Sequence, residues 1–270
     1  RHHPGRAIVW NVYLLGVGAF FLIPLGSILA RSFHELGLPD TQLTFTNYRL
    51  LFDSGFQFAV GASFGKVLAT SLGLALVVAV LTVGCGYFFA RSQRYRPWGS
   101  VDFRFQLPLG ISFLTFTTGL AVLAGNYLPP GILIVWAQIF LTFPLIYSML
   151  RNACREVDPA LTEAAASLGA TRFVRLLTVE LPLLKKPLVT AFAYAMALSL
   201  GDLAAVLSLG NGEVVTLSVA IYRLIGHYRF AQANALGTIF IELAFGLFLV
   251  MEGYGSHFRN VWLKGDGYDD

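Results

Sequence analysis

Six long apolar runs, separated by shorter polar segments, dominate the hydrophobic pattern of this chain. A helix that crosses a membrane needs about 20 mostly apolar residues, because the hydrocarbon layer is about 30 Å thick. The runs are continuous rather than alternating, which favours helices over the strands of a membrane barrel. The predicted spans cover approximately Ala7–Ala30, Phe64–Ala90, Gln106–Gly125, Gly131–Leu150, Pro187–Leu209 and Ala235–Met251.

Composition supports the membrane interpretation and removes several alternatives. Of the 270 residues, 56% are hydrophobic and 13% are charged, whereas soluble domains carry about 25% charged residues. Disordered chains are poor in apolar residues, and two cysteines cannot form a disulfide scaffold. The net charge of +4 would suggest nucleic acid only if the basic residues formed one patch. We therefore expect an all-α, polytopic membrane protein that does not bind nucleic acid.

The basic residues predict the orientation of the six spans. Fourteen of the 19 Lys and Arg residues lie in the two terminal tails and in the segments Arg91–Phe105 and Arg151–Lys186. Cytoplasmic segments are enriched in basic residues. Both termini are therefore expected in the cytoplasm. The first run is expected to remain as a helix rather than to be cleaved as a signal peptide. A chain that begins with Arg1 is expected to be a fragment or the second half of a longer polypeptide.

The segment between the fourth and fifth spans is the least hydrophobic part of the interior. Asp158, followed by a proline, is a strong helix start. Alanine-rich sequence follows, and Gly169 is expected to bend or end the helix. A second short helix is predicted over Thr171–Glu180, with Pro182 ending it. The expected product is a helix, a glycine bend and another helix on the cytoplasmic surface.

Residues spread over twenty positions of this segment resemble a known motif. Glu-Ala-Ala is followed after three residues by Gly, and after nine more by Val-x-Leu-Pro, where the motif usually has Ile in place of Val179. This pattern resembles the EAA motif of permease subunits of binding-protein-dependent ABC importers. The residues that carry the resemblance to the coupling site are Glu163, Ala164, Ala165, Gly169, Leu181 and Pro182.

The resemblance implies a fold, a role and a set of partners. Residues 1–270 would form a single transmembrane permease domain of the type I, MetI-like architecture, with residues 151–186 as the coupling loop that docks on an ATPase subunit. The implied partners are two ATPase subunits, a periplasmic or surface solute-binding protein, and a second six-span half from another copy or the same chain. Alternating access would move the solute across a bacterial inner membrane, which is where the resemblance places the chain.

The chain is not expected to be the ATPase or any other enzyme. A phosphate-binding loop needs Gly, four residues and Gly-Lys-Ser/Thr, but the segment from Gly61 to Val67 is one residue short and lacks the hydroxyl. No catalytic or metal-ligand cluster is predicted. We expect this chain to bind no cofactor, with ATP and Mg held by the partner subunit.

Three short runs in the last third suggest a cargo. Ser199–Asp202, Leu209–Glu213 and Ala220–Arg229 are similar to the end of thiamine-importer permeases, which are double-length chains whose relatives import ferric iron. This similarity implies thiamine or its phosphates as cargo, with ferric iron as the alternative.

Two carboxylates within the predicted spans are candidates for the substrate pathway. Charges inside a membrane usually face a cavity or a partner. Asp202 and Glu242, with aromatic walls from Tyr194 and Tyr222, would attract the thiazolium cation through charge and cation–π contact, and the same oxygens would suit ferric iron. The alternatives are that Asp202 pairs with Arg223 or caps a broken helix, and that Glu242 lies at a subunit interface.

Two other classes of function compete with an importer subunit. An ATP-independent channel or secondary transporter would not bind an ATPase, so copurification of an ATPase discriminates between them. A membrane-embedded enzyme would need a catalytic cluster near the end of a span. On the non-cytoplasmic side, Ser32–Ser63, expected as an amphipathic helix, and Gly210–Asn234 are candidate docking surfaces for a binding protein.

Overall fold

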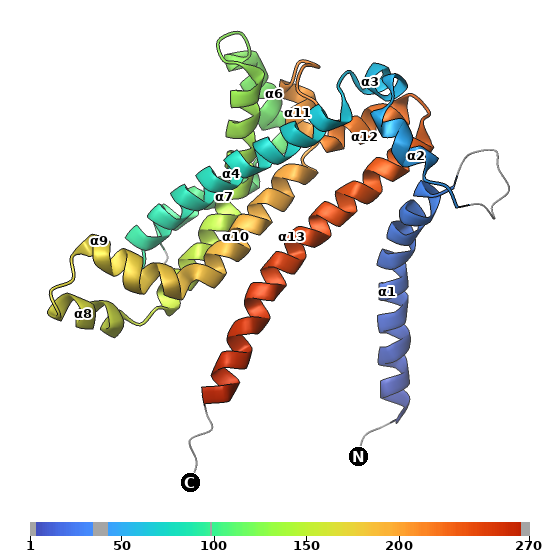
Figure 1. The fold of residues 1–270 in the computed structure, drawn as a ribbon. Helices are drawn as coiled ribbons and strands as arrows, with labels where there is room; N and C mark the ends of the chain where they lie inside the picture. Colours follow the sequence, from blue (N-terminus) through green and yellow to red (C-terminus); the bar gives the residue numbers. More distant parts are fainter. Residues whose placement is uncertain (1–3, 35–42, 98, 266–270) are drawn as a thin grey trace. The chain divides into compact units, whose positions relative to one another are not determined.

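The computed structural model describes residues 4–34, 43–97 and 99–265, and every regular element in these ranges is helical (Figure 1). The all-α prediction is therefore confirmed. The elements are α1 (Pro4–Ser32), α2 (Thr46–Arg49), η1 (Leu50–Phe52), α3 (Ser54–Val60), α4 (Phe64–Ser92), α5 (Ser100–Gln106), η2 (Leu107–Gly110), α6 (Phe113–Ala124), α7 (Pro130–Glu156), α8 (Pro159–Ser167), α9 (Arg172–Arg175), η3 (Leu176–Glu180), α10 (Leu181–Gly201), α11 (Ala204–Leu209), α12 (Leu217–Gly226) and α13 (Phe230–Gly265).

Five of the described helical segments are long and apolar enough to cross a membrane, and a bent pair supplies a sixth. The five lie at the predicted positions, in α1, α4, α7, the continuous stretch Arg172–Gly201, and α13. The third predicted span, Gln106–Gly125, is not one helix. Ser100–Gly110 and Phe113–Ala124 meet at 88°, because Pro108 lacks an N–H and Gly110 is a poor helix former.

The chain forms two compact units. Unit 1 comprises the described residues of Arg1–Lys66 and Ala220–Glu242, and unit 2 those of Val67–Val219 and Leu243–Asp270. Unit 2 contains the segment that sequence analysis singled out for function.

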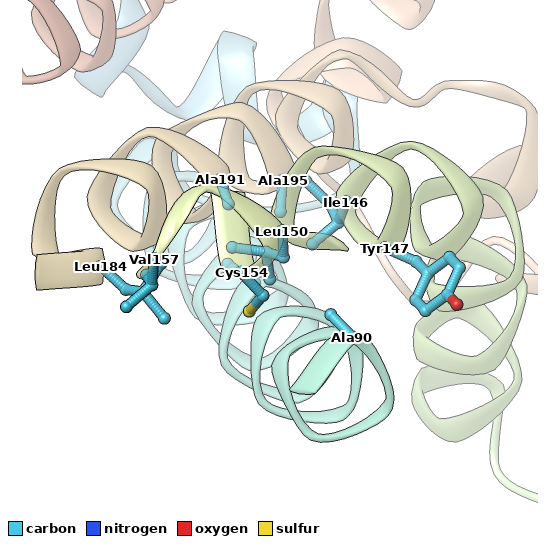
Figure 2. Close-up of a cluster of buried hydrophobic side chains, with 10 residues drawn as sticks. Ala90, Ile146, Tyr147, Leu150, Cys154, Val157, Leu184, Ala191 and Ala195 are labelled. Carbon is cyan, nitrogen blue, oxygen red and sulfur yellow. The ribbon is translucent and has the colours of Figure 1, made fainter. Parts of the chain in front are cut away.

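The core of unit 2 is a cluster in which small side chains let three helices approach closely (Figure 2). Leu150 and Cys154 of α7 face Ala191 and Ala195 of α10, and Ala90 of α4 closes the cluster. Small residues are the usual means of bringing membrane helices together, because backbones can then pack by van der Waals contact. Gly86 of α4 follows the same rule, since a Cβ there would lie 3.3 Å from Ile146 Cγ2.

A fully buried arginine ties the segment after α4 to α7. Arg151 has 0% exposure, and its Nε lies 2.7 Å from Asp102 Oδ1. Nη1 donates to the carbonyl of Gln93 at 2.8 Å, and Nη2 donates to that of Arg96 at 3.1 Å. The Tyr147 hydroxyl donates to Asp102 at 2.5 Å. The two basic segments that were predicted to be cytoplasmic therefore lie at the same end of unit 2.

The amphipathic helix expected over Ser32–Ser63 is not a single element: residues 35–42 lie outside the described part of the chain, and the three short pieces α2, η1 and α3 follow between Thr46 and Val60. Asn47 is buried, and its Nδ2 donates to the carbonyls of Ser32 and His34, both at 2.9 Å. Leu51 is buried, while the neighbouring Phe52 is 76% exposed. Residues 43–63 therefore carry both buried and exposed apolar side chains, on three short helices instead of one.

We expect Arg151→Met to destabilise the protein by about 3–5 kcal/mol, because it leaves the Asp102 carboxylate buried without its cationic partner. Thermal unfolding in detergent would measure the loss. Arg155→Met, a substitution of an exposed arginine one turn along the same helix, is the matched control and should change stability by no more than about 0.5 kcal/mol. Equal unfolding temperatures for the two variants would contradict the assignment.

Candidate functional site: the exposed element between α7 and α10

The helix after α7 begins as its sequence predicts. Asp158 is the N-cap of α8, and its side chain accepts a hydrogen bond from the Ala160 N–H at 2.9 Å. Pro159 occupies the first turn, where a missing N–H costs nothing. Figure 1 shows α8 and α9 beyond the ends of α7 and α10, outside the core of unit 2. The predicted arrangement of helix, glycine bend and helix is therefore present.

Gly169 ends α8 in a left-handed conformation with φ of +83°. The Gly169 N–H donates to the carbonyl of Ala166 at 3.0 Å, and the Ala170 N–H donates to that of Ala165 at 3.1 Å. This pair of bonds is the Schellman motif, which satisfies carbonyls that a helix end leaves without partners. Because only glycine adopts this φ at little cost, the residue fixes the angle at which the chain leaves α8.

One side of α8 packs against the rest of the element, and the other side is exposed. Thr162 is buried, and its carbonyl accepts from Arg175 Nη1 at 3.4 Å. Glu163 and Ala164 are exposed, and Ala165 is half-buried. Leu168, directly after α8, is 88% exposed, and α8 lies outside the helices that are long and apolar enough to cross a membrane. An apolar side chain beside small alanines and one carboxylate is suited to contact with another protein.

The second helix does not end at Pro182, contrary to the sequence prediction. Thr171 caps α9 by accepting from the Val174 N–H at 3.4 Å, and the helix then continues without a break to Gly201. A π-helical turn, Leu176–Glu180, widens it just before the proline, and the Leu181 N–H bonds to the carbonyl of Leu176. A local π adjustment accommodates proline by satisfying the backbone groups that it disturbs. Leu181 and Pro182 therefore lie in the stem leading to α10, not on α8.

Two arginines, one in the last turn of α4 and one just after that helix, contact the element where it ends and where it begins. Arg91 forms a two-pronged ion pair with Glu180, with distances of 2.7 and 3.0 Å. Arg94 Nη2 donates to the carbonyl of Val157 at 2.5 Å, one residue before the cap of α8. Sequence reasoning missed Glu180. The sequence does place this carboxylate directly before Leu-Pro, at the start of an apolar span, where a charged side chain is expected to have a partner.

Asp202 caps a break in the fifth span, which was one of the alternatives considered for it. The predicted span Pro187–Leu209 is interrupted, because α10 ends at Gly201 and α11 begins at Ala204. Asp202 is 9% exposed, and its Oδ1 accepts from the Ala205 N–H at 3.2 Å. Oδ2 accepts from Gln138 Nε2 at 3.0 Å, while Ser199 donates to Gln138 Oε1 at 2.6 Å. Sequence analysis named Ser199 only as part of the run Ser199–Asp202, and it missed Gln138, which was indistinguishable from other isolated polar residues in apolar runs.

The other candidates for the substrate pathway are exposed. Tyr194 lies in unit 2 with Asp202, and within the described residues no hydrogen bond joins the two side chains; it is 42% exposed. Tyr222 and Glu242 belong to unit 1. Tyr222 is 55% exposed, and Glu242 is also exposed. A substrate pathway through these four residues stays a prediction.

Residues 83–253 match the family model described as binding-protein-dependent transport system inner membrane component. The matched range is more than half of the chain, and it includes the exposed element, the two arginines and the Asp202 cluster.

Curated relatives include permeases for two different solutes. The chain is 30% identical to the thiamine transport system permease protein ThiP of Escherichia coli (strain K12) over 198 residues, covering 69% of this chain and 37% of that protein. It is 26% identical to ThiP of Brucella abortus (strain 2308) over 262 residues, covering 95% and 46%. A probable sulfate permease, cysT of Prototheca wickerhamii, is 31% identical over 159 residues, covering 54% and 62%. The chain thus spans less than half the length of these thiamine permeases.

Two solved structures share the fold. One is a crystal structure of a bacterial ABC transporter involved in the import of the acidic polysaccharide alginate, with a TM-score of 0.62 and 19% identity over 95% of this chain and 97% of that one. The other is the bacterial alginate ABC transporter in complex with a periplasmic protein bound to an alginate pentasaccharide, with a TM-score of 0.66 and 17% identity over 95% and 96%. The fold is therefore that of an ABC importer permease.

We expect Gly169→Val to lower the free energy of opening of α8 by about 1–2 kcal/mol, because a branched side chain resists a positive φ. Gly169→Asn should have a smaller effect, since asparagine tolerates this conformation. Apart from the adjoining backbone, no described atom would lie within 4 Å of a Cβ at this position, so the difference between the variants reflects backbone strain. Hydrogen exchange of the α8 amides would measure it, and equal protection in the two variants would argue against a strained cap.

Proposed function

Because the chain belongs to the family of inner-membrane components of binding-protein-dependent transport systems, we propose that it is the permease subunit of an ATP-driven ABC importer. The observation that carries the proposal is the exposed element between α7 and α10, with its capped start and its left-handed glycine end. A surface helix that is rigidly framed at both ends and joined to two long apolar helices is suited to receive force from outside the membrane.

The proposed work of the element is mechanical. α8 would dock in a groove of an ATPase subunit, with Glu163, Ala164, Ala165 and Gly169 at the contact. The exposed Leu168 adds apolar surface that such a groove would bury. When two ATPase subunits close on ATP, the displaced α8 would tilt α7 and α10 and alternate access to the pathway. ATP and Mg would be held by the ATPase, and this chain would bind no cofactor and catalyse no reaction.

The proposed assembly needs further subunits and a fixed orientation. A second six-span half, from a copy or from the same polypeptide, would complete the pathway, and a periplasmic or surface binding protein would deliver the solute. The complex with a periplasmic protein seen for the alginate transporter supports that delivery. Both basic segments lie at one end of unit 2, which supports a cytoplasmic side for α8; a cytoplasmic position of the two termini is proposed from the distribution of basic residues alone.

Thiamine, or a thiamine phosphate, is the proposed cargo, and ferric iron is the alternative. Thiamine permeases match up to 95% of the chain, but a probable sulfate permease matches at similar identity, so likeness alone does not choose. A buried carboxylate at the α10–α11 break favours a cation over an anion such as sulfate. Asp202 would supply that charge while also holding the helix break.

We expect Glu163→Arg and Gly169→Pro to abolish coupling without preventing membrane insertion. The first reverses a charge at the proposed contact, and the second removes the N–H that bonds Ala166 and forbids the positive φ. Uptake per ATP hydrolysed by the reconstituted importer should fall at least about fivefold, the lower end of usual coupling effects. Glu156→Arg, the same charge reversal on an exposed residue outside the motif, should behave like the unmodified protein. Normal uptake in both motif variants would sink the proposal.

For the cargo, we expect Asp202→Asn to lower uptake of labelled thiamine about tenfold, if losing the charge costs the transition state about 1.4 kcal/mol. The asparagine can still accept from the Ala205 N–H, so the unfolding temperature should change little. Gln138→Ala is the control, because it removes a hydrogen-bond partner of Asp202 and keeps the charge. Full uptake by Asp202→Asn would dismiss the acidic pathway.

A further inference from the structure

Two arginine side chains, at and just after the end of α4, bind the two ends of the exposed element. Arg91 lies in the last turn of α4, and Arg94 lies three residues later. Arg91 holds Glu180, where the element passes into α10, and Arg94 holds the carbonyl of Val157, where it leaves α7. We call these two contacts the arginine bracket. They join parts of the chain that are 89 and 63 residues apart.

The bracket has the geometry of a firm connection. Arg91 Nε and Nη2 each meet a different oxygen of Glu180, and the Glu180 side chain is only 8% exposed. A planar guanidinium matches a carboxylate in this two-pronged way and fixes direction as well as distance. The Tyr87 hydroxyl lies 3.5 Å from the same carboxylate. Arg94 is 7% exposed, so water competes little for its bond to Val157.

The position of the bracket matters more than its strength. Glu180 closes the π-helical turn Leu176–Glu180, and such turns are irregular points that frequently mark functional sites. Val157 directly precedes the cap of α8. A displacement of α8 would therefore be transmitted to Val157 and Glu180, the two residues that Arg94 and Arg91 bind. Covalent connection alone would pass a displacement only to α7 and α10.

We propose that Arg91, Arg94 and Glu180 are positioning residues that make α4 move with α8, so that three helices rather than two respond to the ATPase. The inference rests on the proposed function, because it needs a partner that displaces α8. It assigns to α4 an active part in switching the pathway. None of the three residues belongs to the motif that predicts the docking surface itself.

The test is a distance measurement in the complete reconstituted importer with its ATPase and binding protein. Spin labels at Ser167→Cys in α8 and Ser92→Cys in α4 report on exposed positions at the two sides of the bracket, in a background where Cys85 and Cys154 are replaced. We expect the distance between the labels to stay constant between the nucleotide-free and ATP-bound states. In the Glu180→Gln and Arg94→Gln variants it should change with nucleotide, because α8 then moves without α4.

Transport supplies the second readout. Uptake per ATP hydrolysed should fall at least about fivefold in Glu180→Gln, a size usual for coupling between sites, while ATP hydrolysis continues. Arg91→Lys, which keeps the charge but loses the two-pronged geometry, should fall between this variant and the unmodified protein. The exchanged pair Arg91→Glu with Glu180→Arg should recover part of the coupling. Arg104→Gln, which removes an exposed arginine of α5, is the matched control and should couple normally.

The outcomes separate this inference from the function on which it rests. If the unmodified importer shows no ATP-dependent uptake, the proposed function fails and the bracket fails with it. If it transports, but the label distance in Glu180→Gln stays constant and coupling is normal, only the bracket is wrong. Should Glu180→Gln assemble poorly, the same two measurements on Arg91→Lys decide, because that variant keeps the ion pair and changes only its geometry.

Discussion

The burial of the Arg151 guanidinium is the constraint on which the functional end of unit 2 depends. A charge with 0% exposure must be met by partners, because the cost of burying it alone exceeds the stability of a typical domain. Asp102 supplies the opposite charge, and the carbonyls of Gln93 and Arg96 take two of the N–H groups. Those carbonyls flank Arg94. Satisfying one buried cation therefore sets the path of the chain after α4 and presents Arg94 to Val157.

The helices of unit 2 are interrupted where polar groups can compensate for the lost backbone bonds. At the α10–α11 break, the Asp202 carboxylate accepts an N–H that the helix would otherwise have satisfied, and Gln138 steadies the carboxylate from α7. At Pro182 the backbone compensates by itself through a wider turn. Without water, each uncompensated group would cost several kcal/mol. Breaks of this kind are therefore placed by specific residues, and they are the natural points for a bundle to bend.

The fold and the exposed element differ in how closely they depend on particular residues. The fold is shared with an importer permease at only 19% identity, so the arrangement of the helices tolerates wide variation in sequence. The exposed element is set by particular side chains, including the Asp158 cap and the Gly169 bend. We therefore propose that the spans supply a generic scaffold and that a small number of residues at one end convert it into a device that responds to a partner.

The sequence by itself determined the helical class, five of the spans, and the cap and glycine bend of the exposed element, because each depends on local chemistry. A run of about 20 apolar residues forms a membrane-spanning helix in lipid. Asp158 and Gly169 act through backbone groups of their own helix turn. Only the tertiary structure decided that the third span bends by 88° and that the helix continues past Pro182. It alone showed that Asp202 faces Gln138 and that Arg91 meets Glu180. These outcomes depend on residues 64 and 89 positions apart, and no pattern along the chain records which distant partner a buried polar group will find.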